Sequence, residues 1–236
     1  MKTLILNSGT GSRMGELTAK QPKCLSVLRE KETILSRQLH ILSACGVRDI
    51  ILTTGQYHQE LIEYVKGLDL PVRCSYVNNP LYAQTNYIYS IYLAKGELDG
   101  DCLLMHGDLV FDEKLLRRIL SSEESVMAVN FEQEINEKDF KVELHGLRIK
   151  KIGVELRKQV RMAQPLYKIC RDQWNIWIHS IESYCKRGLT KEYAETAFND
   201  VSDHCELRAL SMDDQLCMEV DTPEDLSFVR KILGKE

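Results

Sequence analysis

The stretch Thr3-Leu4-Ile5-Leu6-Asn7-Ser8-Gly9-Thr10-Gly11-Ser12-Arg13-Met14-Gly15, near the start of the chain, decides how the rest is interpreted. A short apolar strand runs into a glycine-rich turn, and Pro22-Lys23 follows soon after it. Gly9 and Gly11 have no side chains that would keep backbone N–H groups from a polyphosphate, and Arg13 and Lys23 bring two cations to the same strand end. The pattern indicates a site for a nucleoside triphosphate.

Two better-known glycine loops do not fit this stretch. A P-loop requires a Lys-Ser or Lys-Thr pair after its last glycine, whereas Gly15 is followed by Glu16 and Leu17. A dinucleotide fingerprint requires Gly-x-Gly-x-x-Gly, and here the third glycine comes one residue late. That fold also needs an acid at the end of its second strand, where this chain has an amphipathic helical pattern instead.

The composition is that of one globular domain. The chain has 236 residues, 44% of them hydrophobic and 28% charged, with a formal net charge of −4. We expect no membrane segment, because no apolar run approaches the roughly 18 residues that a span needs. We expect no nucleic-acid partner, because the basic clusters are short and interleaved with aliphatic residues. Eight scattered cysteines without a Cys-x-x-Cys pair favour a reduced, cytoplasmic protein.

Strand and helix patterns alternate through the first half and give way to short alternating strands in the second. This order predicts an α/β fold with a Rossmann-like, mixed, mostly parallel sheet, helices on both faces and a small inserted β-hairpin at 138–153. Residues 1–236 are expected to form a single domain, with a nucleotide-binding half over about 1–125 and an acceptor-binding half over about 126–236. The expected strands are 2–6, 49–54, 73–77, 101–106, 126–131, 141–145, 147–153, 162–169, 205–211 and 216–219, and the expected helices are 32–44, 59–67, 86–94, 172–187, 191–201 and 222–232.

Two acids follow apolar strands at the edge where ligands bind in open α/β sheets. Asp108 comes after the apolar run that ends at His106, and Asp221 comes just before the helix cap at Thr222. Two carboxylates at two strand ends predict a Mg²⁺ site that faces a triphosphate. Asp108 can instead cap a turn, Asp221 can be a loop acid, and Glu219 is a possible substitute for Asp221.

The pattern Leu-x-x-Gly-x-Gly-x-Arg-x-Gly followed by Pro-Lys resembles the signature loop of the nucleotidyltransferase superfamily. The resemblance implies that the loop backbone wraps a triphosphate, that Arg13 and Lys23 are catalytic and offset charge on the α-phosphate and pyrophosphate, and that Asp108 and Asp221 hold the metal. The family most often has Ala-Ala where this chain has Asn7-Ser8, which makes the base that it binds less certain. The implied nucleotide-binding residues are Leu6, Asn7, Ser8, Gly9, Thr10, Gly11, Ser12, Thr85, Asn86, Ser90, His106 and Gly107.

The segment from Asn79 to Ser90 resembles the bacterial phosphocholine and 2-aminoethylphosphonate cytidylyltransferases. In those enzymes this helix start lies beside the cytosine. Asn86 offers a donor and an acceptor to an amide-like base edge, and Thr85 or Ser90 would assist it. The alternative is that Asn86 only caps the helix.

The acceptor site gives a weaker signal. Aromatic faces hold choline-like cations, but the spacing of Trp174 and Trp177 is more typical of a packed helix face. The resemblance suggests an acceptor pocket that contains Lys141, Tyr167, Tyr193, Glu195 and Asp200.

Together these patterns predict a cytidylyltransferase that moves CMP from CTP to a small phosphorylated or phosphonylated alcohol or amine, phosphocholine-like, and releases pyrophosphate. No general base is needed, because the attacking oxygen is already ionised near pH 7. Two alternatives stay open: a sugar 1-phosphate nucleotidyltransferase that uses UTP or dTTP, and a nucleotide-binding regulatory protein without catalytic activity.

Overall fold

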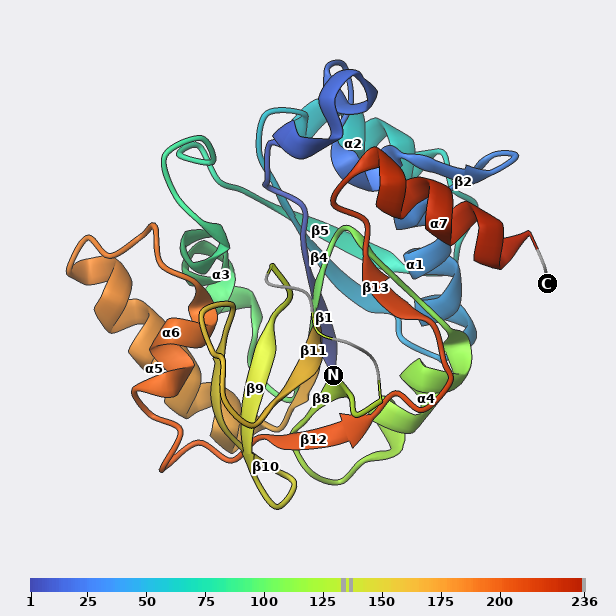
Figure 1. The fold of residues 1–236 in the computed structure, drawn as a ribbon. Helices are drawn as coiled ribbons and strands as arrows, with labels where there is room; N and C mark the ends of the chain where they lie inside the picture. Colours follow the sequence, from blue (N-terminus) through green and yellow to red (C-terminus); the bar gives the residue numbers. More distant parts are fainter. Residues whose placement is uncertain (133–134, 136–137, 235–236) are drawn as a thin grey trace.

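A nine-stranded mixed sheet forms the centre of the computed structural model, which describes residues 1–132, 135 and 138–234 (Figure 1). Its first part is parallel and has the order β5 (Arg73–Asn78), β4 (Asp49–Thr54), β1 (Lys2–Leu6) and β6 (Cys102–His106). β1 lies between β4 and β6, so its carboxyl end, where the glycine-rich loop begins, opens at the middle of the parallel part.

The second part of the sheet is mainly antiparallel. β11 (Val160–Ile169) pairs with β6 and continues through β8 (Val126–Asn130), β12 (Arg208–Ser211), β10 (Arg148–Gly153) and β9 (Lys141–His145). β9 also pairs with β11, so these five strands form a closed ring of pairings. The expected hairpin over 138–153 is therefore β9–β10, and it is an integral part of the sheet.

Helices cover both faces of the sheet, as expected for this α/β fold. α3 (Tyr87–Ala94), α5 (Arg171–Lys186) and α6 (Ala194–Asn199) pack on one face, and α1 (Ile34–Ala44), α2 (His58–Lys66) and α4 (Glu113–Ser121) pack on the other (Figure 1). The alternation of β1 divides the core, since Leu4 and Leu6 join the first cluster and Ile5 joins the second.

α7 (Pro223–Leu233) packs against a small hairpin of β2 (Val27–Arg29) and β3 (Glu32–Thr33) in a third, smaller cluster. It begins with the capping box expected at Thr222: the Thr222 side chain accepts from the backbone N–H of Asp225, and the Asp225 carboxylate accepts from the Thr222 N–H at 2.9 Å. Pro223 supplies the fixed φ of a first helical turn. This cap holds the segment that carries Asp221.

Several short elements were not expected from the sequence. They are β7 (Leu109–Phe111), which pairs antiparallel with β13 (Cys217–Glu219), the hairpin β2–β3, and the 3-10 segments η1 (Ser12–Thr18), η2 (Lys23–Leu25) and η3 (Lys95–Glu97). The helix expected over 191–201 is shorter than predicted and spans only α6. The pairing of β7 with β13 matters most, because it joins the two acidic segments.

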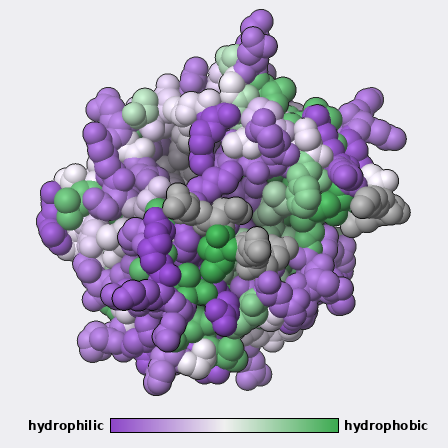
Figure 2. All heavy atoms as spheres, viewed as in Figure 1, coloured by the Kyte–Doolittle hydropathy of each residue, from purple (hydrophilic) through white to green (hydrophobic). Residues whose placement is uncertain are grey.

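The surface seen in Figure 1 is mostly hydrophilic. Hydrophobic side chains gather there in one patch over β9 and in another over α7 (Figure 2). Among the helices of the described ranges, none combines the length and the apolar character that crossing a membrane requires.

Candidate active site

A cleft of about 350 Å³ lies at the carboxyl ends of β1 and β6. The glycine-rich loop forms one wall, and residues from β6, the start of α3, the end of β13 and the segments beside β9 and β10 contribute to the others. Ligands bind in open α/β sheets at this edge. The predicted residues that line the cleft are Leu6, Asn7, Ser8, Gly9, Thr10, Gly11, Ser12, Arg13, Lys23, Thr85, Asn86, His106, Gly107, Asp108, Tyr193 and Asp221.

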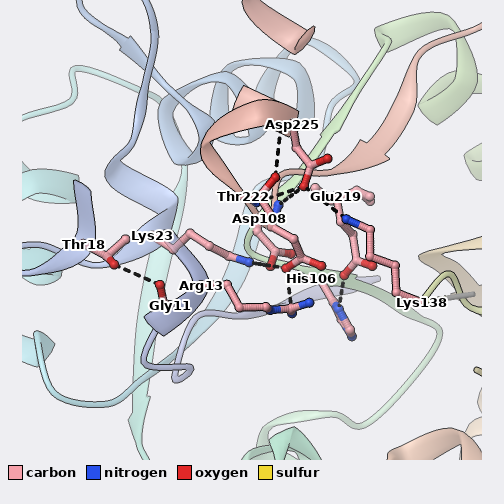
Figure 3. Close-up of polar contacts among 12 residues, drawn as sticks. Gly11, Arg13, Thr18, Lys23, His106, Asp108, Lys138, Glu219, Thr222 and Asp225 are labelled. Carbon is pink, nitrogen blue, oxygen red and sulfur yellow. Dashed lines mark hydrogen bonds and ion pairs between the residues drawn. The ribbon is translucent and has the colours of Figure 1, made fainter. Parts of the chain in front are cut away.

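An ion-pair network of two cations and two acids crosses the cleft (Figure 3). The Lys23 ammonium lies between the carboxylates: it contacts Asp108 Oδ2 and lies 2.7 Å from Asp221 Oδ1. Arg13 Nη2 lies 2.8 Å from the same Asp221 oxygen. The side chains of Lys23, Asp108 and Asp221 are only 14–17% exposed, whereas that of Arg13 is 63% exposed. The network therefore combines three part-buried charged groups with one that is largely exposed.

Burial and charge shift the pKa values inside this network in opposite directions. Burial lowers the pKa of Lys23, but the charges of Asp108 and Asp221 and their hydrogen bonds outweigh burial and raise it above its ordinary value. Burial raises the pKa of Asp108, but the charge of Lys23 outweighs it, so the net shift is downward. Both partners consequently remain charged at neutral pH.

The fold brings these distant residues together through short contacts. Asp108 precedes β7 and Asp221 follows β13, and the register of Leu109 opposite Glu219 sets the two ends side by side. The backbone N–H of Val220 donates to the carbonyl of Asp108 at 2.9 Å, which fixes the separation of the two acids. Lys23 begins η2, directly after Pro22, and extends from there between them.

Two glycines of the loop differ in what they do. Gly11 has a φ of 65°, and a Cβ there would lie 3.1 Å from the Lys23 Cβ, so both conformation and space require glycine. Thr18 holds the turn by donating to the Gly11 carbonyl at 2.9 Å. Apart from Gly9 and its two chain neighbours, no heavy atom of the described residues lies within 4 Å of the position that a Cβ would take on Gly9. The backbone at Gly9 therefore borders open space inside the cleft, as close approach by a ligand requires.

Asn7 and Gly107 are packed against each other at the base of the cleft. A Cβ on Gly107 would lie 1.8 Å from Asn7 Oδ1, so the Asn7 side chain occupies the space that glycine leaves. Asn7 is 8% exposed, and its Nδ2 has no hydrogen-bond partner among the described residues. The backbone N–H of Asn7 donates to Thr53 Oγ1 at 3.0 Å. An unpaired buried donor is costly, which makes Asn7 a candidate for contact with a ligand.

His106 and Glu219 form a second polar pair beside the acids. His106 Nδ1 lies 2.8 Å from Glu219 Oε1. Burial lowers the pKa of His106, but the hydrogen bond to Glu219 and the charges of Glu219 and Asp108 outweigh burial and raise it to about 9. His106 also meets the ring of Tyr87 edge-on, with the ring centres 4.7 Å apart, and contacts Phe140. Burial, offset in part by the hydrogen bond with His106, raises the pKa of Glu219 above its ordinary value.

The donor set at Asp108 and Asp221 fits a hard divalent cation such as Mg²⁺. Both acids offer carboxylate oxygens, and the buried Asp108 Oδ1 has no hydrogen-bond partner among the residues that the structure describes. Ligand atoms of His106, Asp108 and Glu219 also lie within 4.8 Å of one another. That set is a weaker fit, because a metal binds neutral imidazole and His106 Nδ1 already lies 2.8 Å from Glu219 Oε1.

Comparison with known proteins agrees with the fold and the loop. Residues 3–174, more than half of the chain, match the MobA-like NTP transferase domain. The chain belongs to this family.

Two curated relatives of this NTP transferase chain are named for cytidylyl chemistry. The CMP-5'-(3-aminopropyl)phosphonate synthase of Streptomyces rubellomurinus is 32% identical over 125 residues, which cover 53% of this chain and 20% of that protein. The choline-phosphate cytidylyltransferase of Streptococcus pneumoniae is 37% identical over 114 residues, which cover 47% of this chain and 46% of that protein. The matched part is therefore between about a fifth and about half of each relative's length.

The solved structure of the CTP:phosphocholine cytidylyltransferase from Streptococcus pneumoniae superimposes on this NTP transferase with a TM-score of 0.81. The match covers 98% of both chains at 22% sequence identity. Identity at this level shows that the two share a fold. The predicted α/β nucleotidyltransferase fold with a mixed sheet is thus confirmed.

The residues predicted to contact the base are of two kinds: some line the cleft, and others lie behind its surface. Thr85 and Asn86 line the cleft. Asn86 also caps α3, since its side chain accepts from the Tyr87 N–H at 2.8 Å. Ser90 is fully buried and lies behind Ser8, with 2.6 Å between the two hydroxyl oxygens. Ser90 therefore supports the loop from behind, whereas the sequence predicted that it contacts a nucleotide.

Four of the five predicted acceptor residues lie outside the cleft surface. Lys141 is 3% exposed, and its ammonium donates to the backbone carbonyls of Asp139 and Val154. Tyr167 and Glu195 are buried and hydrogen-bonded to each other, and Asp200 accepts from the hydroxyl of Tyr184 at 2.6 Å. Each side chain has an internal partner and is absent from the lining of the cleft, so its position does not support the predicted direct contact with an acceptor. Of the five, Tyr193 lines the cleft.

Sequence reasoning missed several residues that line the cleft, namely Cys24, Tyr82, Tyr87, Lys138, Phe140 and Val154. Tyr87 directly follows the predicted Asn86, and the first turn of a helix that starts at a cleft was a usable signal for it. Phe140 and Val154 flank β9 and β10, and only the closed ring of strands brings them to the cleft. Their sequence context carries no comparable signal.

Proposed function

We propose that this protein is a cytidylyltransferase, which transfers CMP from CTP to a small phosphorylated or phosphonylated amine and releases pyrophosphate. One observation carries the proposal: Arg13, Lys23, Asp108 and Asp221 come from distant parts of the chain and meet in one ion-pair network beside a glycine-rich loop. A site for a nucleoside triphosphate with a divalent cation needs charges of both signs at one place.

Each charged group has a distinct part in the proposed reaction. The acceptor's phosphate or phosphonate oxygen attacks the α-phosphorus in line, the bond to the bridging oxygen breaks, and pyrophosphate leaves with that electron pair. Arg13 and Lys23 stabilise the added negative charge, and the backbone around Gly9 accommodates the phosphates. Mg²⁺ held by Asp108 and Asp221 would supply further neutralisation of the triphosphate when bound. Catalysis then rests on positioning and charge.

The choice of CTP rests on the relatives named for cytidylyl chemistry and on the polar groups beside the loop. Asn86 and Thr85 line the cleft and offer donors and acceptors to a base edge. The unpaired Asn7 Nδ2 adds a donor that Ala-Ala loops lack.

The preference for an amine acceptor rests on the aromatic wall of the cleft. The ring of Tyr193 contacts the rings of Tyr87 and Phe140, with ring centres 5.8 and 5.4 Å apart. Aromatic faces attract a cationic head group.

The test is a pyrophosphate-release assay with Mg²⁺, in which CTP, UTP, dTTP and GTP are combined one by one with phosphocholine, phosphoethanolamine, 2-aminoethylphosphonate and glucose 1-phosphate. We expect release only with CTP and an amine-bearing acceptor. Release with UTP or dTTP and glucose 1-phosphate would replace the proposal by the sugar nucleotide alternative. Binding of CTP without release under any combination would favour a regulatory protein.

A further inference from the structure

Glu195 lies behind the aromatic wall as a fully enclosed carboxylate. It is 1% exposed, and each of its two oxygens accepts a hydrogen bond from a tyrosine hydroxyl. Tyr167 donates to Oε1 at 2.7 Å from the core side, and Tyr87 donates to Oε2 from the cleft side. Of the two tyrosines, Tyr167 is wholly buried and Tyr87 lines the cleft. Glu195 therefore links the protein core to the wall.

The helix that carries Glu195 is held in place from two sides. α6 lies beside α3 and α5 (Figure 1). Trp177 and Ser180 of α5 donate to the α6 carbonyls of Ala194 and Ala197 at 2.8 and 2.7 Å. Asn199 pairs with the backbone N–H and C=O of Ile152 in β10, both at 2.8 Å. These hydrogen bonds to α5 and β10 hold the six-residue helix α6, and with it Glu195, in a fixed position.

The hydrogen bond to Glu195 also fixes the ring of Tyr87, which lines the cleft. Its ring meets His106 at 4.7 Å and Tyr193 at 5.8 Å between centres, so a rotation of Tyr87 would disturb both neighbours. Burial, and after it the negative charge of Glu195, raises the pKa of Tyr87 well above its usual value, so the hydroxyl remains a donor. Without an acceptor, that buried hydroxyl would be left unpaired and would seek another orientation.

We propose that Glu195 is a positioning residue for acceptor binding: it fixes the ring of Tyr87, and through that ring the aromatic wall, while it never touches the acceptor. The inference rests on the proposed function for its kinetic consequence. It differs from the direct contact that the sequence suggested, since both carboxylate oxygens already have partners. It also separates Glu195 from the nucleotide side, where the loop and the ion-pair network lie.

The kinetic test compares Glu195→Leu, Glu195→Gln and Tyr87→Phe, with Tyr167→Phe as the matched control that removes the other hydrogen bond of the same carboxylate. We expect Glu195→Leu and Tyr87→Phe to raise the acceptor KM about tenfold, which corresponds to about 1.4 kcal/mol. The rise in the acceptor KM should exceed any change in the CTP KM by at least about threefold. Glu195→Gln keeps the shape and one acceptor oxygen, so it should restore most of the acceptor affinity. Tyr167→Phe should lower the melting temperature as much as Tyr87→Phe but leave the acceptor KM within twofold.

Two results overturn the proposal. One is an equal rise in acceptor KM for Tyr87→Phe and Tyr167→Phe, which would mean that the effect follows stability. The other is an unchanged KM in folded Glu195→Leu or, if that variant does not fold, in Tyr87→Phe.

A second readout keeps the inference testable if the wild type transfers no nucleotide and the proposed function fails. Aromatic ¹³C NMR, with the Tyr87 signals assigned from Tyr87→Phe, should show a shifted and faster-flipping Tyr87 ring in Glu195→Leu but not in Tyr167→Phe. Identical Tyr87 signals in all three proteins would refute the positioning role whatever the reaction is.

Discussion

Lys23 lies between Asp108 and Asp221, in a position that a metal ion bound by the two acids would also need. Removing its charge should therefore change the reaction rate and the affinity for a metal ion in opposite directions. Substituting Lys23 by Met should slow nucleotidyl transfer, because a cation that stabilises the phosphates is lost. The same substitution should strengthen binding of a divalent ion when no nucleotide is present, because the competing ammonium is lost.

The structure sets the size of the second effect. At the 2.7 Å between Lys23 Nζ and Asp221 Oδ1, an effective dielectric constant of about 20 gives an attraction of about 6 kcal/mol before desolvation is subtracted. Burying an ammonium costs several kcal/mol, which offsets most of this attraction. A remainder of about 1.4 to 2.7 kcal/mol corresponds to a roughly tenfold to hundredfold gain in affinity for the ion. The loss in turnover should be about a hundredfold or more, as for removal of one charge-stabilising group.

Titration calorimetry with Mn²⁺ in the absence of nucleotide measures the gain in ion affinity. Pyrophosphate release measures the loss in turnover. Arg13→Met is the matched control. Arg13 contacts only one of the two acids in this network, and its side chain is 63% exposed, so its loss should change Mn²⁺ affinity by less than about threefold. A folded Lys23→Met protein that binds Mn²⁺ no more tightly than wild type would refute the competition. A rate within twofold of wild type would remove Lys23 from the reaction.

Three further outcomes test other parts of the structure. Gly107→Ala should destabilise the protein by roughly 1–3 kcal/mol, as overpacking does, because the new Cβ would lie 1.8 Å from Asn7 Oδ1. Adding Asn7→Ala removes that clash, so the double variant should recover part of the lost stability in urea unfolding. Hydrogen bonds from Lys95 and a second lysine lower the pKa of Glu182 to about 2. The stability that this group adds is present above pH 4.5 and is lost as the pH falls toward 2, so Glu182→Gln should weaken the wild type at pH 6 and have no effect near pH 2 in urea titrations. Asn199→Ala removes two hydrogen bonds to β10 and should cost roughly 1–3 kcal/mol, which a melting temperature within 1 °C of wild type would contradict.

Much of the parallel half of the fold was predictable from local sequence. The runs that form β1, β4 and β6 each contain at least three consecutive apolar residues, and such runs occur where both faces of a sheet are covered. The cap at Thr222 was predictable because a hydroxyl, a proline and two acids follow one another at fixed spacing. These signals act over a few residues, so one sequence contains them in full.

The pairing of β7 with β13 was beyond the reach of those signals. Each strand has three residues, and about a hundred positions separate them in the chain. Three residues have no measurable alternation, and the partner of a strand is set by long-range packing. The sequence therefore indicated that Asp108 and Asp221 each follow a strand, while their common position depends on a contact that local patterns do not encode.

The sequence also does not reveal which way an acidic side chain faces, and this limited the prediction of the acceptor residues. Glu195 and Glu219 are both glutamates close to aromatic residues in sequence or space, yet Glu195 is enclosed by two hydroxyls whereas Glu219 lines the cleft. α6 has six residues, too few for an amphipathic pattern to assign its faces.

The charges of the ion-pair network are costly to bury alone, as is the carboxylate of Glu195. A site for a polyphosphate and a metal ion must hold cations and anions of its own, and each is costly to bury alone. Lys23, Asp108 and Asp221 meet that cost by pairing with one another. Any ligand that the site binds must then exchange one set of ion pairs for another. The sequence assigned Lys23 to a phosphate and the acids to a metal, and the structure adds that these three groups also serve as one another's partners.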